Sequence, residues 1–275
     1  MKISDTKIKL FQQEILTWYK IHKRSLPWRD VPVGTSLQER AYMTLVSEVM
    51  SQQTQINRVV VKFDAWMKRF TTVEDVARAT VADVLAYWSG LGYNRRALNL
   101  KKTSEIIVGQ CKGKFPQTEE ELVRLPGIGA YTARAVLCFA FDQQLAVVDT
   151  NVRKIIVTQF GIDGKGKQLQ EIADQLLPKG KSSEWNQALM DYAATMLKKE
   201  KIPIPKQSKF VGSHRYYRGK VLKILLKKKK IFQDDLGLLI KENYVQTDKP
   251  WLQKLLMELE EEGFIRQVNG MIVLS

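Results

Sequence analysis

Two acidic residues, far apart in the sequence, stand where carboxylates could carry out acid–base chemistry. Glu48 lies between apolar residues in SEVMSQQT (residues 47–54), a segment with helical periodicity, and the amides Gln52 and Gln53 follow it. Asp149 follows an apolar run and begins another helical segment. Each also has an ordinary explanation, Glu48 as a charge on a helix surface and Asp149 as a helix N-cap. Since a carboxylate can cap a helix and still act in catalysis, both are candidates for a general acid or base.

The sequence LPGIG at residues 125–129 predicts a tight turn between two helices, the second beginning at Ala130 or Tyr131. Because Gly127 and Gly129 lack Cβ atoms, such a turn can approach a phosphate closely. Backbone N–H groups at the start of the next helix favour an anion there. The pattern alone is equally typical of an ordinary glycine-containing turn between helices.

Helical periodicity runs through most of the sequence before residue 200, and strand signals there are weak. We therefore expect an all-α fold, with helices joined by short connections containing Gly, Pro and Thr. The expected helices are residues 7–20, 41–70, 81–89, 96–108, 119–124, 131–141, 151–159, 166–176 and 183–199.

Composition changes at residues 198–211, KKEKIPIPKQSKFV, which carry two prolines, several lysines and no periodicity, as linkers do. We place a domain boundary between residues 209 and 210. Beyond it we expect a small winged-helix-like domain over residues 210–275, a scaffold that does not by itself identify a function. The lysine run at 227–230 fits phosphate contacts and a solvated helix end equally. The expected elements are helices 217–228, 233–242 and 249–262 and a β-hairpin within 264–274, turning at Asn269-Gly270.

The charge of the chain indicates a partner with negative charge. The formal net charge is +15 at pH 7 and the sequence pI about 9.7. A protein that lies along nucleic acid has this composition, although an anionic membrane surface or simple solubility also accounts for it.

The chain has two cysteines, Cys111 and Cys138, which argues against a disulfide framework. Residues 1–10 lack the pattern of a secretory signal. No segment reaches the roughly 18 apolar residues that a transmembrane helix needs. We therefore expect a reducing compartment that contains DNA, namely the cytoplasm in association with the nucleoid, and no membrane partner.

Six segments together resemble the helix-hairpin-helix (HhH-GPD) glycosylase superfamily, which includes endonuclease III, and within it the MutY-type adenine DNA glycosylases. The resemblance implies two helical lobes around a DNA-binding cleft, over residues 1–209. It also implies a base excision repair enzyme that extrudes a base from duplex DNA and hydrolyses its N-glycosidic bond. The segments, in family order, are LPWR (26–29), SEVMSQQTQ (47–55), WSGLGYNRRALNL (88–100), LPGIGAYTA (125–133), VVDTNV (147–152) and WNQALMDYA (185–193).

The resemblance gives the two carboxylates complementary roles. Glu48 matches the acid that protonates the departing purine, so it must hold a proton near neutral pH, which desolvation favours. Asp149 matches the ionised partner that stabilises the cationic sugar. Breaking the bond develops positive charge on the sugar and negative charge on the base, so one acid and one carboxylate suit the chemistry. Asn151 would position Asp149 and the water, or simply cap the helix.

Tyr131 stands where bifunctional relatives such as endonuclease III carry a lysine that attacks the sugar. Without an amine at this position no Schiff base forms there. The resemblance therefore implies a monofunctional enzyme that leaves an abasic site without cutting the strand. Tyr131 would support Asp149 or the sugar; the alternative is a buried aromatic residue whose hydroxyl finds a partner.

Further residues match DNA-contacting positions of the family. Gln53 and Tyr93 match side chains that intrude near the orphaned base, and Gln52 lies beside them. Arg95, with Arg96, would neutralise phosphates or is merely exposed. The remaining predicted contacts are Leu125, Gly127 and Gly129 of the turn, and Trp28, Arg29 and Gln187 lining the pocket for the extruded base, each with an alternative explanation in packing.

The chain departs from the family where most relatives carry four cysteines that hold an iron–sulfur cluster. The corresponding positions are Leu197, Ile204, Gln207 and Ser213, and such a cluster needs thiolates. We expect no cluster, with local packing and the basic linker in its place. The sequence leaves open whether a structural monovalent cation binds at the turn of residues 125–129.

The chain also departs from the family pattern in features that bear on the choice of substrate. Typical MutY-type enzymes carry a larger C-terminal domain that resembles a Nudix fold and helps to recognise 8-oxoguanine, and here the tail is short. Ser51 stands where leucine is usual, and Asn94 where a second tyrosine is common. The first hypothesis is an enzyme that removes adenine opposite 8-oxoguanine or guanine, and a mismatch thymine or uracil glycosylase is a close alternative. The third hypothesis is a catalytically silent DNA-binding protein, and the presence of both Glu48 and Asp149 argues against it. We expect a monomer with double-stranded DNA as partner.

Overall fold

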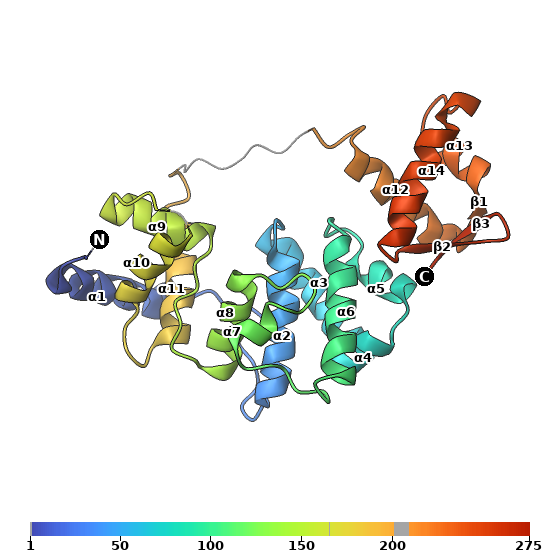
Figure 1. Cartoon of the computed structure of the whole chain (residues 1–275). Coiled ribbons are helices and arrows are strands. Elements are labelled where there is room, and N and C mark those ends of the chain that lie inside the picture. Colours follow the sequence, from blue (N-terminus) through green and yellow to red (C-terminus); the bar gives the residue numbers. More distant parts are fainter. Residues whose placement is uncertain (1, 165, 201–208) are drawn as a thin grey trace. The chain divides into compact units, whose positions relative to one another are not determined.

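The computed structural model describes residues 2–164, 166–200 and 209–275, and helices dominate them, which confirms the predicted fold class (Figure 1). Its elements are α1 (Asp5–His22), α2 (Leu37–Ser51), α3 (Ile56–Arg69), α4 (Val73–Arg78), α5 (Val81–Trp88), α6 (Arg95–Gly109), α7 (Glu119–Leu122), α8 (Ala130–Phe141), α9 (Thr150–Phe160), α10 (Lys167–Leu176), α11 (Ser182–Thr195), α12 (His214–Lys228), β1 (Lys230–Phe232), α13 (Gln233–Ile240), the 3₁₀ turn η1 (Gln246–Asp248), α14 (Lys249–Glu261), β2 (Ile265–Val268) and β3 (Met271–Leu274).

The chain forms two compact units, each built from two separate stretches. Unit 1 comprises Met1–Val49 and Lys114–Ile204, and unit 2 comprises Met50–Gly113 and Pro205–Ser275. The predicted division between residues 209 and 210 stays a prediction.

The core of unit 1 lies where α1, α9, α10 and α11 pack together. Trp185 of α11 is fully buried, and its ring meets that of Phe11 of α1 edge to face at 5.8 Å. A smaller cluster of Ala135, Cys138, Val147 and Met190 joins α8 to α11 and to the segment before Asp149. Residues that are distant in the sequence thus share these two apolar clusters, which fix α8, α9 and α11 in place.

In unit 2 the helices between residues 50 and 113 pack around two tryptophans. Trp66 of α3 and Trp88 of α5 are fully buried, with their rings edge to face at 5.8 Å. The indole Nε1 of Trp88 donates to the Gly92 carbonyl at 3.0 Å, which satisfies its N–H and fixes the loop that precedes α6.

The prediction of one helix over residues 41–70 is wrong, because α2 ends at Ser51 and α3 begins at Ile56. Gln53 has a left-handed backbone (φ 55°), which interrupts a right-handed helix. The Arg96 guanidinium donates to the carbonyls of Met50 and Gln52. These donors satisfy carbonyl groups at the end of α2, so the apolar periodicity on both sides does not keep the helix continuous.

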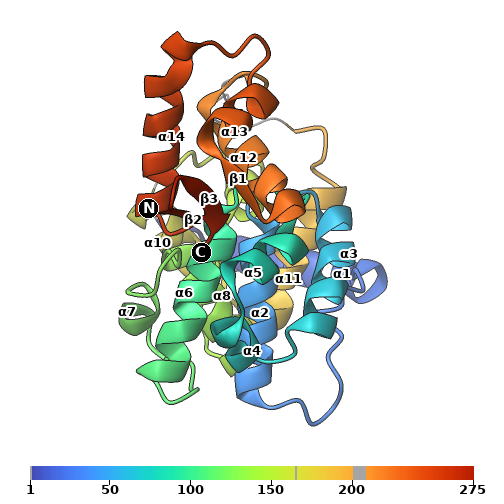
Figure 2. The ribbon, with the colours of Figure 1, turned by 90° about the vertical axis from the view of Figure 1, so that its right-hand side faces the viewer.

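The C-terminal region (residues 210–275) contains a three-stranded antiparallel sheet in the order β1-β3-β2, beside α12 and α14 (Figures 1 and 2). β2 and β3 form the predicted hairpin, and Asn269 (φ 50°) and Gly270 (φ 74°) have the left-handed conformations of a type I′ turn. β1 is an additional strand that the sequence pattern did not predict. None of the helices in the described part of the chain combines the length and apolar character that crossing a bilayer takes.

Candidate active site

Glu48 lies on α2, half-buried, with the buried residues Ser47 and Val49 beside it. Burial raises the pKa of Glu48 to about 7, the negative charge of Asp149 adds to the rise, and a hydrogen bond with Tyr131 and the positive charge of Arg29 oppose it. The two predicted carboxylates are therefore near enough to interact electrostatically. A carboxyl group with this pKa holds a proton for much of the time near neutral pH.

Tyr131 lies in the first turn of α8, and its ring packs against the smaller cluster of unit 1. Its hydroxyl is hydrogen-bonded to the carboxyl group of Glu48, whereas the sequence had suggested Asp149 or the sugar as its partner. Burial, together with the charges of Glu48 and Asp149, raises the pKa of Tyr131 well above its ordinary value. The phenol therefore stays protonated and can donate to Glu48.

Asp149 is the N-cap residue of α9, and its side chain is half-buried. The Val152 backbone N–H donates to Oδ1 at 2.8 Å, and Nδ2 of Asn151 donates to Oδ2 at 2.7 Å. Burial raises the pKa of Asp149, while these hydrogen bonds, which stabilise the ionised form, lower it. Asn151 is not itself the cap of α9, because Asp149 is the N-cap residue; its amide instead orients the Asp149 carboxylate at the start of the helix.

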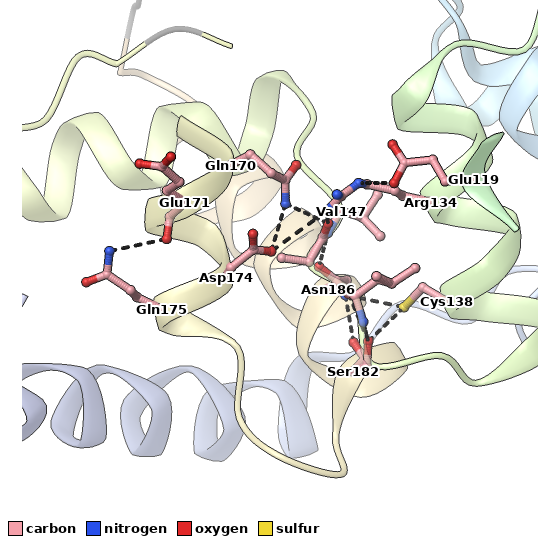
Figure 3. Close-up of polar contacts among 12 residues, drawn as sticks. Glu119, Arg134, Cys138, Val147, Gln170, Glu171, Asp174, Gln175, Ser182 and Asn186 are labelled. Atoms are coloured by element: carbon pink, nitrogen blue, oxygen red, sulfur yellow. Dashed lines mark hydrogen bonds and ion pairs between the residues drawn. The ribbon is translucent and has the colours of Figure 1, made fainter. Parts of the chain in front are cut away.

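The segment that leads into Asp149 is held by buried side chains of α11 (Figure 3). Asn186 accepts from the Val147 backbone N–H at 2.8 Å and donates to the Leu145 carbonyl at 2.9 Å. Ser182 Oγ accepts a hydrogen bond from the Leu145 backbone N–H at 3.2 Å and donates one to the Leu145 carbonyl at 2.9 Å. Backbone groups of Leu145 and Val147, which lie outside any helix or strand, thus find side-chain partners on α11, which fixes the approach to Asp149.

The three residues predicted for the base pocket line one cavity of about 240 Å³ in unit 1: Trp28, Arg29 and Gln187. The Gln187 amide is oriented at both ends, because Oε1 accepts from the Tyr19 hydroxyl at 3.0 Å and Nε2 donates to Ser183 Oγ at 3.4 Å. The cavity therefore presents a fixed amide beside a cation and an indole ring.

Asp191 holds Arg29 at this cavity, and sequence reasoning did not identify it. Its side chain is completely buried and accepts from Arg29 Nη1 at 2.9 Å and 3.0 Å. It also accepts from the backbone N–H of Arg24 at 3.0 Å and from Nε of that residue at 2.8 Å. The signal was an aspartate between Met190 and Tyr192 in an apolar helix, since a carboxylate in such a place needs cationic partners.

The turn at residues 125–129 has the predicted form. Leu125 and Ile128 are buried, whereas Gly127 and Gly129 are exposed, and Gly127 has φ 76°. Gly129 is the N-cap residue of α8. The ion pair of Arg134 with Glu119 at 2.9 Å connects α8 to α7 across the turn (Figure 3). The first N–H groups of α8 thus come directly after two exposed glycines, whose lack of side chains leaves room for an anion.

Four other predicted residues, Gln52, Gln53, Tyr93 and Arg95, line a cavity in unit 2. Gln53 (φ 55°) and Tyr93 (φ 47°) have left-handed backbones, which are uncommon for residues other than glycine. Backbone strain of this kind is concentrated at functional sites.

The residues at the cluster positions do not fit an iron–sulfur cluster. Leu197 is buried and apolar, Ser213 caps α12, and Ile204 and Gln207 lie outside the described residues. Cys138 is buried and hydrogen-bonded to Ser182 at 3.1 Å. Within residues 2–164, 166–200 and 209–275, no three His, Cys, Asp or Glu side chains gather as metal ligands would.

Adenine DNA glycosylases of other organisms are similar to this chain over about two thirds of its length. The chain is 40% identical to the adenine DNA glycosylase of Rattus norvegicus over 194 residues, which are 68% of this chain and 38% of that protein. It is 38% identical to the adenine DNA glycosylase of Mycolicibacterium smegmatis over 187 residues, which are 66% of this chain and 62% of that protein. The chain therefore spans less than two thirds of the length of these relatives.

Solved structures share the fold. A thermostable thymine-DNA glycosylase superposes with a TM-score of 0.63 at 28% identity, over 70% of this chain and 88% of that one. An endonuclease III–DNA covalent intermediate superposes with a TM-score of 0.58 at 19% identity, over 70% of this chain and 86% of that one. The model of the family described as "HhH-GPD superfamily base excision DNA repair protein" matches residues 46–179. Residues 46–179 of the chain thus form a domain of the HhH-GPD superfamily of base excision DNA repair proteins.

Proposed function

We propose that this protein is a monofunctional DNA glycosylase that hydrolyses the N-glycosidic bond of a mispaired adenine extruded from duplex DNA. One observation carries the proposal: the Glu48 carboxyl group, with a pKa of about 7, is hydrogen-bonded to Tyr131 within electrostatic reach of Asp149. Similar proteins of rat and human origin, 40% and 38% identical, are named adenine DNA glycosylases.

In the proposed reaction Glu48 donates its proton to the purine ring, and the electron pair of the breaking glycosidic bond passes to the base. Asp149, ionised and held by Asn151 and the Val152 N–H, stabilises the positive charge that develops on the sugar. Water then adds to the sugar carbon and gives a proton to the Glu48 carboxylate, which restores the acid and leaves an abasic site. The Tyr131 hydroxyl orients Glu48 throughout.

The absence of an amine from the side chain at position 131 supports an enzyme that leaves the DNA strand uncut. Tyr131 occupies the position at which bifunctional relatives have a nucleophilic lysine, and its hydroxyl is engaged with Glu48. Cleavage of the strand through a Schiff base needs such an amine at the sugar. We therefore propose glycosylase activity without lyase activity, and no iron–sulfur cluster, since the chain has two cysteines and not the four that the cluster takes.

The cavity of Trp28, Arg29 and Gln187 is the proposed pocket for the extruded base. An indole ring can stack on a base, and an amide held at both ends can hydrogen-bond the edge of a base without rearranging. The turn at Leu125, Gly127 and Gly129 would hold a phosphate of the same strand. The remaining predicted contacts to the duplex are Gln52, Gln53, Tyr93 and Arg95.

A second candidate substrate is thymine or uracil opposite guanine. The thermostable thymine-DNA glycosylase, 28% identical over 70% of this chain, favours it. A catalytically silent DNA-binding protein fits less well, because a silent scaffold has no need of a half-buried carboxyl group with a raised pKa. We further propose that the protein acts as a monomer on double-stranded DNA in the cytoplasm, associated with the nucleoid.

The test is incubation with labelled duplexes that hold adenine opposite 8-oxoguanine or guanine, or thymine or uracil opposite guanine, with and without alkali. We expect strand breaks only after alkali and only with the adenine duplexes. Breaks without alkali would contradict the monofunctional assignment. Breaks confined to the thymine or uracil duplexes would establish the second substrate, and no base release from any duplex would overturn the proposal.

A further inference from the structure

A cavity of about 790 Å³ lies within unit 2, between the C-terminal region and the loop before α6; we call it the C-terminal pocket. Cavities of about 300–1,000 Å³ hold small ligands in other proteins. Two hydrogen bonds hold the C-terminal region against this part of unit 2: Arg215 Nη1 donates to the Tyr93 hydroxyl at 3.0 Å, and Lys102 Nζ of α6 donates to the Glu262 carbonyl at 3.1 Å. The pocket therefore exists only because the C-terminal region packs on this loop.

Aromatic side chains at the C-terminal pocket are accessible to a ligand. Phe210 is 57% exposed and Tyr93 is 39% exposed, and both line the cavity. A large exposed ring is costly to keep in water, whereas a nucleobase provides a flat face on which such a ring stacks. The two rings therefore favour a planar, aromatic ligand.

The charges at the pocket favour an anion. Arg218 is paired with Glu262 at 2.7 Å. Arg215 also lines the cavity, and its hydrogen bond to the Tyr93 hydroxyl at 3.0 Å orients its guanidinium there. Arg95 is 71% exposed, and its ion pair with Glu262 is long, at 3.9 Å. Helix α12 carries six lysines and arginines and no acidic residue, so the positive potential extends beyond the pocket itself.

Amide side chains complete the lining. Gln52, Gln53 and Asn99 are at the cavity, and amides can both donate to and accept from the edge of a base. The left-handed backbones of Gln53 and Tyr93 place two strained residues at this one cavity. Stacking surfaces, cations and amides together suit a nucleotide better than an acidic peptide, which would leave the aromatic faces unused.

We propose that the C-terminal pocket binds one nucleotide of the DNA duplex, with its base against Tyr93 and Phe210 and its phosphate at Arg215 and Arg95. This inference rests on the proposed function, because it assigns the C-terminal region to the duplex on which the active site acts. The region is then a second DNA-binding element that restrains a distorted strand.

The first test fills the pocket. Gly219 on α12 lines it, and a Cβ atom added there meets no heavy atom within 4 Å. Gly219→Leu therefore removes cavity volume and raises helix propensity, so thermal stability stays equal or rises. In the full chain carrying Asp149→Asn, we expect the variant to weaken binding of a fluorescein-labelled adenine·8-oxoguanine duplex roughly five- to a hundredfold, the range for one lost stacking contact. Gly219→Ala is the control, with at most a small change.

The second test removes charge. Arg215→Gln keeps a hydrogen-bond donor but loses the cation, so we expect weaker binding of the same duplex and a decrease of about 1 in the slope of log Kd against log salt concentration, as for one lost phosphate contact. Lys223→Gln removes a charge from an exposed position of the same helix that is not part of the pocket, and it should leave the slope nearly unchanged.

The results separate the two proposals. If the wild-type chain releases adenine and both Gly219→Leu and Arg215→Gln bind the duplex with wild-type affinity, the pocket assignment is overturned and the proposed function stands. If no duplex loses a base but both variants weaken binding as stated, the proposed function fails and the pocket assignment stands. Equal losses for Lys223→Gln and Arg215→Gln would also overturn the assignment, because they would indicate a diffuse charge effect only.

Discussion

The surroundings of Glu48 bring its pKa to a value that suits a general acid. Desolvation opposes its ionisation and Asp149 adds repulsion, while the Tyr131 hydroxyl and the charge of Arg29 limit the rise, so its pKa comes to about 7. A general acid is most effective when its pKa lies near the working pH. Burial also raises the pKa of Asp149, but the hydrogen bonds from the Val152 N–H and the Asn151 amide to its carboxylate oppose that rise. The two carboxyl groups thus differ in their surroundings, which supports the different roles proposed for them.

The first prediction concerns the pH dependence of base release. Because Glu48 must be protonated, kcat/KM should fall about tenfold per pH unit above pH 7 or so. Glu48→Gln should lower the rate roughly 10²- to 10⁴-fold and abolish this falling limb. Glu39→Gln, at an exposed glutamate of the same helix whose pKa a hydrogen bond from Ser36 lowers, should retain the wild-type profile. A falling limb that persists in Glu48→Gln would assign the titration to another group.

The second prediction concerns stability. The folded-state pKa of Glu48, about 7, lies above its ordinary value of 4.5. The folded protein therefore retains this proton while the unfolded chain releases it, and the free energy of unfolding falls as pH rises from 4.5 to 7. The loss is at most about 3 kcal/mol, less because the side chain is partly exposed. Urea denaturation should show a smaller fall for Glu48→Gln than for wild type, and equal falls would refute the link.

At the scale of elements, Asp191 of α11 anchors Arg29 at the cavity proposed as the base pocket. Removing one partner of a buried ion pair leaves the other charge uncompensated, which costs about 3–5 kcal/mol. Asp191→Asn leaves Arg29, whose side chain is 10% exposed, without its carboxylate, so we expect a loss of that order in chemical denaturation.

Asp163→Asn is the matched control for Asp191→Asn. It breaks an ion pair with Arg153 in which the Asp163 side chain is 56% exposed, and such pairs contribute about 0–1 kcal/mol. Similar losses for the two variants would mean that Asp191 is not the anchor of Arg29.

The turn between α7 and α8 depends on the backbone of Gly127. Its φ of 76° lies in the left-handed region, where a side chain costs about 1–2 kcal/mol. Gly127→Ala should therefore lower the free energy of unfolding by about that amount and weaken duplex binding, measured by anisotropy. Gly109→Ala, within α6 and with open space around an added Cβ, should be neutral or stabilising. If both variants bind DNA like the wild type, the turn is only structural.

At the scale of the whole molecule, local patterns predicted what local forces determine. Periodicity located most of the helices, and Asn269-Gly270 located the hairpin. Short elements were missed: α4 has six residues and β1 has three. The signal for α4 was present, because Thr72 and Asp75 form a capping box. β1 depends on pairing with β3, which is distant in sequence, so no local pattern reveals it.

For the candidate site, the sequence predicted which residues belong together but not the contacts between them. The resemblance grouped Glu48, Tyr131 and Asp149, and the structure brings these three into electrostatic contact. The hydrogen bond that joins Tyr131 to Glu48, and the anchoring of Arg29 by Asp191, depend on which faces of distant helices meet. Sequence spacing does not contain that information, and neither does it contain the cavity that the C-terminal region forms over Tyr93.

The central claim is that Glu48 and Asp149 act together on one glycosidic bond, and single-turnover kinetics of Asp149→Asn tests it most directly. With an adenine·8-oxoguanine duplex, the rate of alkali-labile site formation should fall at least about a hundredfold, because the developing sugar cation loses its counter-charge. The Kd for the duplex should stay within a few-fold of wild type. Base release at the wild-type rate by Asp149→Asn would contradict the account.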